Sequence, residues 1–293
     1  MDRIDFIKKG LMGTGMFLTA NAIGNVIKND IDELQELELI GFNHIPTTTS
    51  KIMENTIIHK AETRGHANHG WLNSYHSFSF ANYYNPDRMH FGALRVLNDD
   101  QVEAGMGFGT HPHDNMEIIT LPLRGALRHK DNMGNQAVIQ ANEVQVMSAG
   151  TGVTHSEFNA NSDADVNLLQ IWLFPKLRNV QPRYDQRSFK PENRVNELQT
   201  VVTPIGQEEG ESVGIHQDAW FSLGTLEANI EKTYPVRLKS NGVYIFVIEG
   251  DVTVDGNLLN KRDAIGIWDI DSVSIKAESN AEILIMDVPM NLN

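Results

Sequence analysis

The sequence predicts an all-β fold of the closed or double-sheet kind. Many short apolar segments alternate with polar residues, as strands with one buried face do. Turns marked by glycine separate these segments, and no stretch has the sustained 3.6-residue periodicity of a long helix. Strands of this kind bury their apolar face by closing into a barrel or by stacking as two sheets.

Residues 1–27 form a signal-like N-terminal segment. A basic start precedes a short apolar run, and Ala20-Asn21-Ala22 has the small-x-small form of a cleavage site. A twin-arginine export signal has a similar order of residues, although Ile4 stands where its second arginine would be; the matching residues are Arg3, Phe6, Ile7 and Lys8. Export to the periplasm is therefore slightly favoured over a cytoplasmic location. A general secretory signal and an uncleaved amphipathic helix are the alternatives, and the run is too short and glycine-rich for a stable membrane span.

Residues 28–56 are acidic and irregular and are predicted to be a linker. The first folded domain is expected over residues 57–180. Its apolar segments predict strands at 57–58, 91–97, 116–121, 144–146 and 168–174. Asn98-Asp99-Asp100 is interpreted as a turn, because Asn and Asp are typical turn residues. Three histidines of a loop-rich stretch are interpreted as structural, hydrogen-bonded side chains: His66, His69 and His76.

A polar, proline-containing connection is predicted over residues 181–204, and a second β domain over residues 205–293. Strands are expected at 243–248, 252–254, 263–268 and 283–288. Asp255-Gly256 is a hairpin signal, because both residues accept the positive φ of a type I′ turn.

The stretch from Met106 to Gly125 contains His111-Pro112-His113. Side chains two residues apart lie on the same face of a strand, so both imidazoles are expected to point the same way. Pro112 has no N–H, which places it at a sheet edge, a bulge or a strand start.

A second metal-capable pair follows in the glycine-rich stretch 148–159, where His155-Ser156-Glu157 repeats the spacing of two. Three imidazoles and one carboxylate suit a divalent first-row metal with room for water or substrate. Surface histidines on turns are the alternative interpretation.

These motifs occur within a longer match. The stretch from Ile57 to Phe189 resembles the pirin family of the cupin superfamily, and within it the bacterial pirin-like quercetin 2,3-dioxygenases. Five phrases in family order carry the resemblance: residues 64–71, 76–84, 107–113, 147–152 and 182–187.

The resemblance implies a bicupin, with two jelly-roll β-barrels in one chain. It implies that the N-terminal barrel holds the metal through His111, His113, His155 and Glu157, and that Glu157 is also the catalytic base. Glu117 matches a carboxylate that other cupins use as a ligand, and is expected close to the metal without binding it. The second half has one histidine, His216, and is expected to be a metal-free, cupin-like domain.

The activity that the resemblance implies is opening of a flavonol ring with O2 and release of carbon monoxide. Fe(II) is the first expectation for the metal, with Cu, Mn, Ni, Co and Zn as alternatives, and no other cofactor is expected. Phe108 and Phe158 could flank a flat ligand or simply pack in the core. Two other functions remain open: a redox-sensitive regulatory or protein-binding module, and a metal-binding cupin with another substrate.

The composition limits the partners. A net charge of −14 argues against a broad nucleic-acid-binding surface, because phosphate contacts need clustered Lys and Arg. The absence of cysteine excludes a disulfide framework, thiolate catalysis and a cysteine metal site. The expected partners are a small aromatic, flavonol-like substrate and O2, and the chain is expected to be a monomer.

Overall fold

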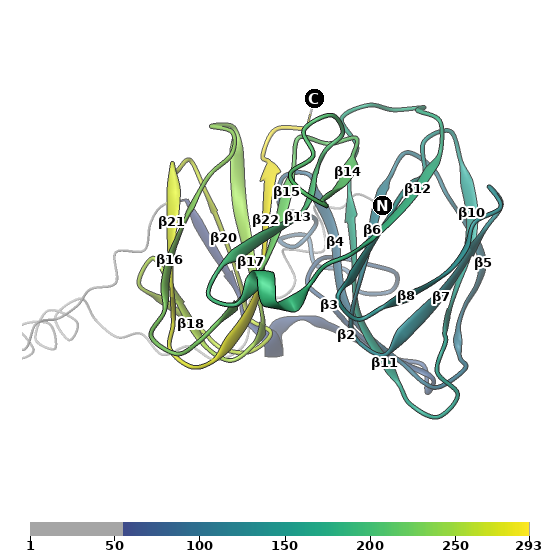
Figure 1. Ribbon diagram of the computed structural model, residues 1–293, viewed down its shortest axis with the longest axis horizontal. Helices are drawn as coiled ribbons and strands as arrows, with labels where there is room; N and C mark the ends of the chain where they lie inside the picture. The colour runs from purple at the N-terminus through teal and green to yellow at the C-terminus, as the bar shows by residue number, and fades with distance from the viewer. Residues whose placement is uncertain (1–54, 293) are drawn as a thin grey trace, which may run out of the picture. The chain divides into compact units, whose positions relative to one another are not determined.

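The computed structural model describes residues 55–292. These residues form two β-barrels, each made of a seven-stranded and a four-stranded sheet (Figure 1). The described helices are two 3-10 turns, η1 (Ala61–Thr63) and η2 (Pro191–Arg194), and within residues 55–292 no helix has the length and hydrophobicity to cross a bilayer. The predicted all-β fold with two barrels is confirmed. The signal-like segment 1–27 and nearly all of the predicted linker lie outside the described residues.

The N-terminal barrel has its seven-stranded sheet toward the other barrel and its four-stranded sheet on the far side (Figure 1). The seven-stranded sheet has the order β12 (Arg183–Ser188), β9 (Glu143–Ser148), β6 (Glu117–Arg124), β11 (Val166–Leu173), β4 (Leu94–Val102), β3 (Leu72–His76) and β2 (Gly65–Asn68). The four-stranded sheet has the order β5 (Gly107–His113), β10 (Val153–Asn159), β7 (Ala126–Asp131) and β8 (Gln136–Gln140).

The C-terminal barrel has the same construction. Its seven-stranded sheet has the order β1 (Thr56–His59), β20 (Ala264–Trp268), β17 (Asn241–Glu249), β22 (Ala281–Pro289), β15 (Trp220–Leu226), β13 (Leu198–Pro204) and β14 (Val213–Ile215). Its four-stranded sheet has the order β16 (Glu231–Pro235), β21 (Ser272–Ala277), β18 (Val252–Val254) and β19 (Asn257–Leu259).

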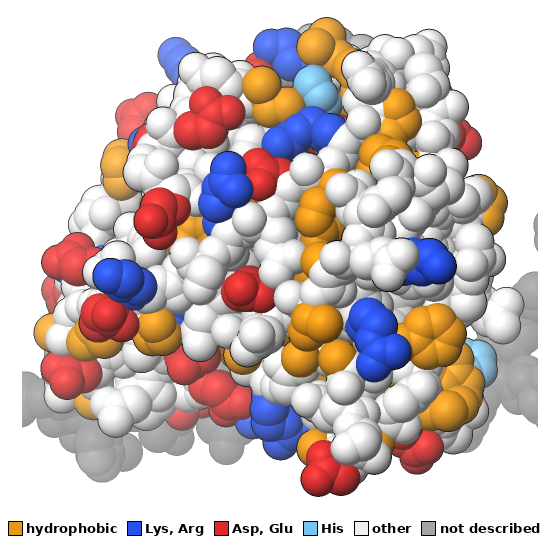
Figure 2. Space-filling view, turned by 45° about the vertical axis from the view of Figure 1, so that its right-hand side comes forward, with side chains coloured by type: hydrophobic (Ala, Val, Ile, Leu, Met, Phe, Trp, Pro, Cys, Tyr) orange, Lys and Arg blue, Asp and Glu red, His pale blue; other side chains and the backbone are white. Residues whose placement is uncertain are grey.

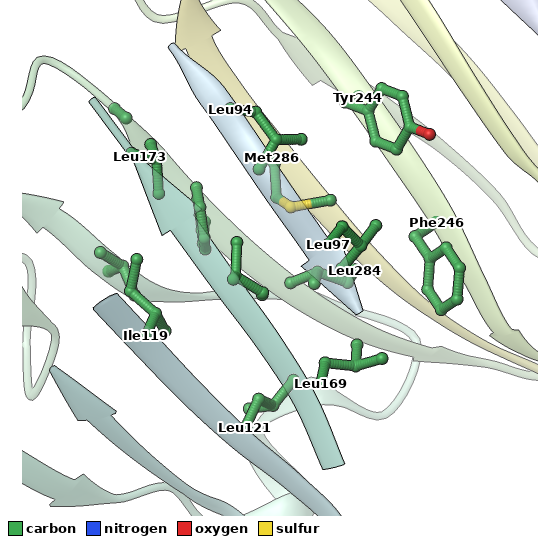
Figure 3. Close-up of a cluster of buried hydrophobic side chains, with 14 of the residues drawn as sticks. Leu94, Leu97, Ile119, Leu121, Leu169, Leu173, Tyr244, Phe246, Leu284 and Met286 are labelled. Carbon is green, nitrogen blue, oxygen red and sulfur yellow. The ribbon is translucent and has the colours of Figure 1, made fainter. Parts of the chain in front are cut away.

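Residues along the facing strands alternate between two hydrophobic environments. On β17, Tyr244 and Phe246 enter the core between the barrels, whereas Val243, Ile245 and Val247 fill the interior of the C-terminal barrel. Figure 3 shows the core between the barrels, where side chains of β4, β6 and β11 meet side chains of β17 and β22. The period of two in a strand thus lets each seven-stranded sheet serve two cores. Both faces are apolar on the buried strands, which explains their continuous apolar runs in the sequence.

Two strands cross the boundaries predicted for the first domain. β1 lies before the N-terminal barrel in sequence but pairs with β20 of the C-terminal barrel, with Ile57 opposite Gly266. β12 lies in the predicted connection 181–204, yet it pairs with β9 of the N-terminal barrel, with Arg183 opposite Ser148. Both strands are short and lie at sheet edges, so they carry a weak sequence pattern, and their partners are chosen by tertiary pairing.

Of three local predictions from the sequence, two are confirmed and one is wrong. Pro112 lies in β5, which is an edge strand, so its missing N–H breaks no ladder bond, as predicted. The hairpin turn is confirmed, since Asp255 and Gly256 have φ values of 43° and 82° between β18 and β19. The turn predicted at 98–100 is wrong, because these residues continue β4.

On the face shown in Figure 2, Lys and Arg side chains are scattered among Asp and Glu side chains. Apolar side chains lie between them over the N-terminal barrel. This face therefore has no single extended patch of one charge.

Candidate metal centre

Three of the four predicted ligands converge on the inside of the N-terminal barrel. The antiparallel pairing of β5 with β10 puts His111 directly opposite His155, and His113 opposite Val153. The ring centroids of His111 and His155 are 4.4 Å apart, and that of His113 is 4.9 Å from each. One ring nitrogen from each histidine lies within 4.8 Å of the others. The two motifs are brought together, as the family resemblance implied.

Glu157 lies beside this trio but is held toward the opposite sheet. A register shift between His155 and Glu157 interrupts the pairing of β10 with β5. Gln170 Nε2–H donates to both carboxylate oxygens of Glu157, at 3.2 and 3.0 Å, and the Thr120 hydroxyl donates at 3.3 Å. Glu157 belongs to a second potential ligand group, with His155 and His129. His155 is common to both groups, so it lies at the centre of the site.

His129 is a site residue that the sequence analysis missed. It lies on β7, directly opposite Glu157, and its ring centroid is 5.3 Å from that of His155. Its Nε2–H donates to Asp131 at 3.1 Å, and Tyr184 packs on the ring at 4.9 Å. The spacing of two between His129 and Asp131 was a usable signal. The pairing of β7 with β10 could not be inferred from it, because partner choice among strands is not a local property.

Two of the histidines are neutral at neutral pH. Burial, together with the neighbouring imidazoles, lowers the pKa of His113 to about 4 and that of His155 to about 3. At Asp131 burial acts to raise the pKa, but hydrogen bonds from Asn135 and His129 bring it below its usual value. Asp131 is therefore an anion at neutral pH. It accepts the Nε2 proton of His129 and leaves Nδ1 as a lone pair directed elsewhere.

The side chains present fit a metal ion. Within residues 55–292, His113 Nε2, both ring nitrogens of His155 and His129 Nδ1 are buried without a hydrogen-bond partner. At His111, Nδ1–H donates to the Gly109 carbonyl at 2.7 Å, which directs the free lone pair to Nε2. Buried polar atoms are normally paired, so several unpartnered nitrogens at one point indicate a site for a cation.

A cavity of about 420 Å³ opens beside the histidines. His111, His113 and Glu157 line one part of it. Aromatic rings form much of the remaining wall: Trp71, Phe80, Phe108 and Trp172. Trp172 presents its edge to His113 at 4.8 Å, and Trp71 packs against Phe108 at 5.3 Å. The cavity is large enough for a flat, multi-ring ligand placed against the histidines.

Of the other residues discussed in the sequence, Glu117 lies away from the metal site. It points from the opposite face of β6 and accepts a hydrogen bond from Ser148 at 2.7 Å. Its expected position near the metal is thus wrong.

Phe108 lines the cavity, whereas Phe158 is 36% exposed and does not. His66 is hydrogen-bonded to Asn73, as expected of a structural histidine. His76 lines the cavity and has no hydrogen-bond partner within the described residues, so its interpretation as a hydrogen-bonded structural side chain is wrong.

Comparisons with known proteins agree with this architecture. Residues 58–173 match the family model of Pirin, and residues 200–288 match that of the quercetinase C-terminal cupin domain. Quercetin 2,3-dioxygenase of Escherichia coli K12 is 45% identical over 232 residues, covering 79% of this chain and 98% of that protein. A pirin-like protein of Caulobacter vibrioides is 39% identical over 223 residues, covering 76% of this chain and 95% of that protein.

Solved structures agree as well. The crystal structure of bacterial pirin YhhW in complex with nickel(II) from Escherichia coli has a TM-score of 0.75 and 44% identity. The match covers 80% of this chain and 99% of that one. Quercetin 2,3-dioxygenase from Acinetobacter baumannii shares the fold at 16% identity, with a TM-score of 0.65 over 80% of this chain and 79% of that chain.

Proposed function

Because the chain belongs to the pirin family of cupin proteins, we propose that it is a metal-dependent dioxygenase that opens the ring of a flavonol-like substrate with O2 and releases carbon monoxide. The observation that carries the proposal is the trio of imidazoles of His111, His113 and His155, with the Glu157 carboxylate beside it, next to an aromatic cavity. The relatives named quercetin 2,3-dioxygenase support the substrate class.

His111, His113, His155 and Glu157 would hold one divalent transition metal, with Fe(II) as the first candidate. The nickel complex of a relative supports a divalent ion at this site. Three neutral imidazoles and one carboxylate leave the centre with a net positive charge. When bound, the metal supplies positive charge and redox capacity, which the side chains themselves lack.

Glu157 would act as the base. It takes the proton of the flavonol 3-hydroxyl, so that the O–H bond breaks and the electron pair stays on the substrate oxygen. Gln170 and Thr120 hold the carboxylate by hydrogen bonds and orient the oxygen that receives the proton. In the overall reaction both atoms of O2 enter the ring-opened depside, and one ring carbon leaves as carbon monoxide with its oxygen.

The aromatic wall would position the substrate. Trp172 and Phe80 meet edge to face at 5.4 Å, and a flat ring system fits against such surfaces by stacking and edge contacts. The same rings exclude water from the reacting atoms, which strengthens the electrostatic interaction between the base and its proton donor.

Oxygen uptake with quercetin tests the proposal. The protein is loaded separately with Fe(II), Cu(II), Mn(II), Ni(II) or Co(II), and carbon monoxide is trapped. We expect uptake with at least one metal, with carbon monoxide released in proportion. Glu157→Gln should retain metal and lower turnover by about 10²–10⁴-fold, the usual contribution of a positioned base.

His113→Ala serves as the metal-deficient control and should show no uptake. Unchanged turnover in Glu157→Gln would remove Glu157 as the base. No uptake with any metal, in protein that binds one ion per chain, would favour a metal-binding regulatory protein instead.

A further inference from the structure

We propose that the cavity has a second recognition subsite, formed by His76, Asn98 and Asp100, which binds phenolic hydroxyl groups at the end of the ligand remote from the metal. This inference rests on the proposed function, since it names the substrate class of the same cavity. All three side chains line that cavity and none of them belongs to the ligand groups.

Strand register places the subsite away from the metal. His76 on β3 is directly opposite Asn98 on β4, and Asn98 is directly opposite Gln170 on β11. Gln170 is hydrogen-bonded to Glu157, so it marks the metal end of this row. His76 lies two strand spacings farther along, which is about 10 Å. That separation is comparable with the length of a flat ligand of three rings.

The subsite presents polar atoms without partners. His76 and Asn98 are each 3% exposed. Within residues 55–292, both ring nitrogens of His76 and Oδ1 of Asn98 are buried and make no hydrogen bond. Such atoms are uncommon in protein interiors, because their interaction with water is lost without replacement. Their concentration on one cavity wall indicates a polar ligand.

Asp100 adds a group that can donate or accept. It is directly opposite Ser74 in the β3–β4 pairing, and the Ser74 hydroxyl donates to it. Burial, together with the negative charges of Asp99 and Glu157, raises the pKa of Asp100 to about 7, although the hydrogen bond from Ser74 opposes the shift. Near neutral pH a protonated fraction can therefore donate a hydrogen bond.

The chemistry of this wall fits phenols better than charged groups. Burial lowers the pKa of His76, as do His66, His69 and Arg64, so its ring is neutral and offers one donor and one acceptor. A phenolic hydroxyl has the same two capacities. Phe80 stacks on the His76 ring at 5.3 Å and continues the aromatic wall to Trp172. A ligand with an aromatic body and hydroxyl groups at its far end matches both features.

Calorimetric binding by the metal-loaded protein, in the absence of oxygen, tests the subsite. Quercetin carries hydroxyl groups on both outer rings, and 3-hydroxyflavone carries none there. We expect quercetin to bind the unmodified protein at least about tenfold more tightly than 3-hydroxyflavone. Asn98→Leu and His76→Phe should each weaken quercetin binding by about tenfold and leave 3-hydroxyflavone unchanged.

His66→Phe is the matched control, since His66 is exposed and does not line the cavity. It should change neither affinity. Equal affinity of the unmodified protein for the two ligands would overturn the subsite, as would equal losses for both ligands in the variants. If Asn98→Leu does not fold, His76→Phe carries the test alone.

The two proposals fail differently. Binding is measured without O2, so discrimination between the ligands with no later oxygen uptake would reject the dioxygenase and keep the subsite. Uptake with equal affinities would reject the subsite alone.

Discussion

The two barrels share a construction but differ in what fills them. In the N-terminal barrel, strand register aligns five inward polar side chains across the seven-stranded sheet: His76, Asn98, Gln170, Thr120 and Gln145. In the C-terminal barrel, a row across three central strands consists of Ile265, Ile245 and Ile285, all completely buried.

The two interiors serve different purposes, one stability and the other the binding of a ligand. Close packing of aliphatic side chains stabilises a barrel and leaves no room for a ligand. Polar side chains inside a barrel weaken it, because burying them costs free energy unless they find partners. The hydrophobic core between the barrels joins them, so the packed C-terminal barrel can stabilise the N-terminal barrel, whose interior contains the polar site.

The largest expected effect is the loss of metal from the N-terminal barrel. His155→Ala removes the side chain shared by both ligand groups, so stoichiometric metal binding should be lost. The fold should survive, since the hydrophobic cores contain no ligand residue. Elemental analysis after loading and desalting measures occupancy, and circular dichroism monitors the fold. Full occupancy in the variant, with His66→Ala as control, would show that the ion lies elsewhere.

A core truncation should act mainly on the other barrel. Ile285→Ala removes a buried side chain from the aliphatic interior and should lower the free energy of unfolding by about 2–5 kcal/mol. Metal stoichiometry should not change. Urea unfolding gives the free energy, and elemental analysis gives the stoichiometry.

Gln145→Leu is the counterpart in the N-terminal barrel. Both side-chain amide atoms of Gln145 are buried without a partner among the described residues, so an apolar side chain of similar size should change stability by less than about 1.5 kcal/mol. Similar large losses in the two variants would contradict the proposed division between the barrels.

A pH-dependent effect is expected at Glu117, which faces the region between the barrels. Burial raises its pKa to about 7, although hydrogen bonds from Ser148 and the His216 backbone oppose the shift. The pKa of Glu117 is higher in the folded protein than its ordinary value of about 4.5 in the unfolded chain. Its contribution to stability is therefore complete below pH 4.5 and is lost as the pH rises to 7. Glu117→Gln removes the titration. Relative to the unmodified protein, the free energy of unfolding of the variant should rise by on the order of 3 kcal/mol between pH 4.5 and 7.

Urea unfolding at pH 5 and pH 8 measures this gain. An unchanged difference between the two proteins would mean that Glu117 ionises normally in the fold. His90→Gln, at an exposed site, is a suitable control for general effects of a titratable substitution.

The sequence was informative where a feature depends on neighbouring residues. The edge position of Pro112, the turn at Asp255-Gly256 and the shared face of the two side chains within each histidine motif follow from backbone chemistry and the period of a strand. The convergence of the two motifs was implied by the family resemblance. The pairing of distant strands could not be predicted, because nothing in the sequence near His129 indicates that β7 lies beside β10.

The segment 98–100 failed for a different reason. Asn and Asp are common in turns because their polar side chains favour exposed chain, and here such side chains line the inside of a barrel. Asn98 and Asp100 face the cavity from the middle of a strand. A polar run was therefore interpreted as chain outside the core, whereas its residues line the cavity inside the N-terminal barrel.

The position of β1 also bears on how the protein is made. This strand leaves the ribosome before either barrel, yet its partner β20 follows about two hundred residues later; the Ala61 N–H bonds to Asp263 across a separation of 202 residues. The second barrel therefore cannot close until synthesis is nearly complete. Contacts so distant in sequence form slowly. Until β20 has been synthesised, the apolar face of β1, which carries Ile57, is exposed to solvent or covered by chaperones or by the first barrel.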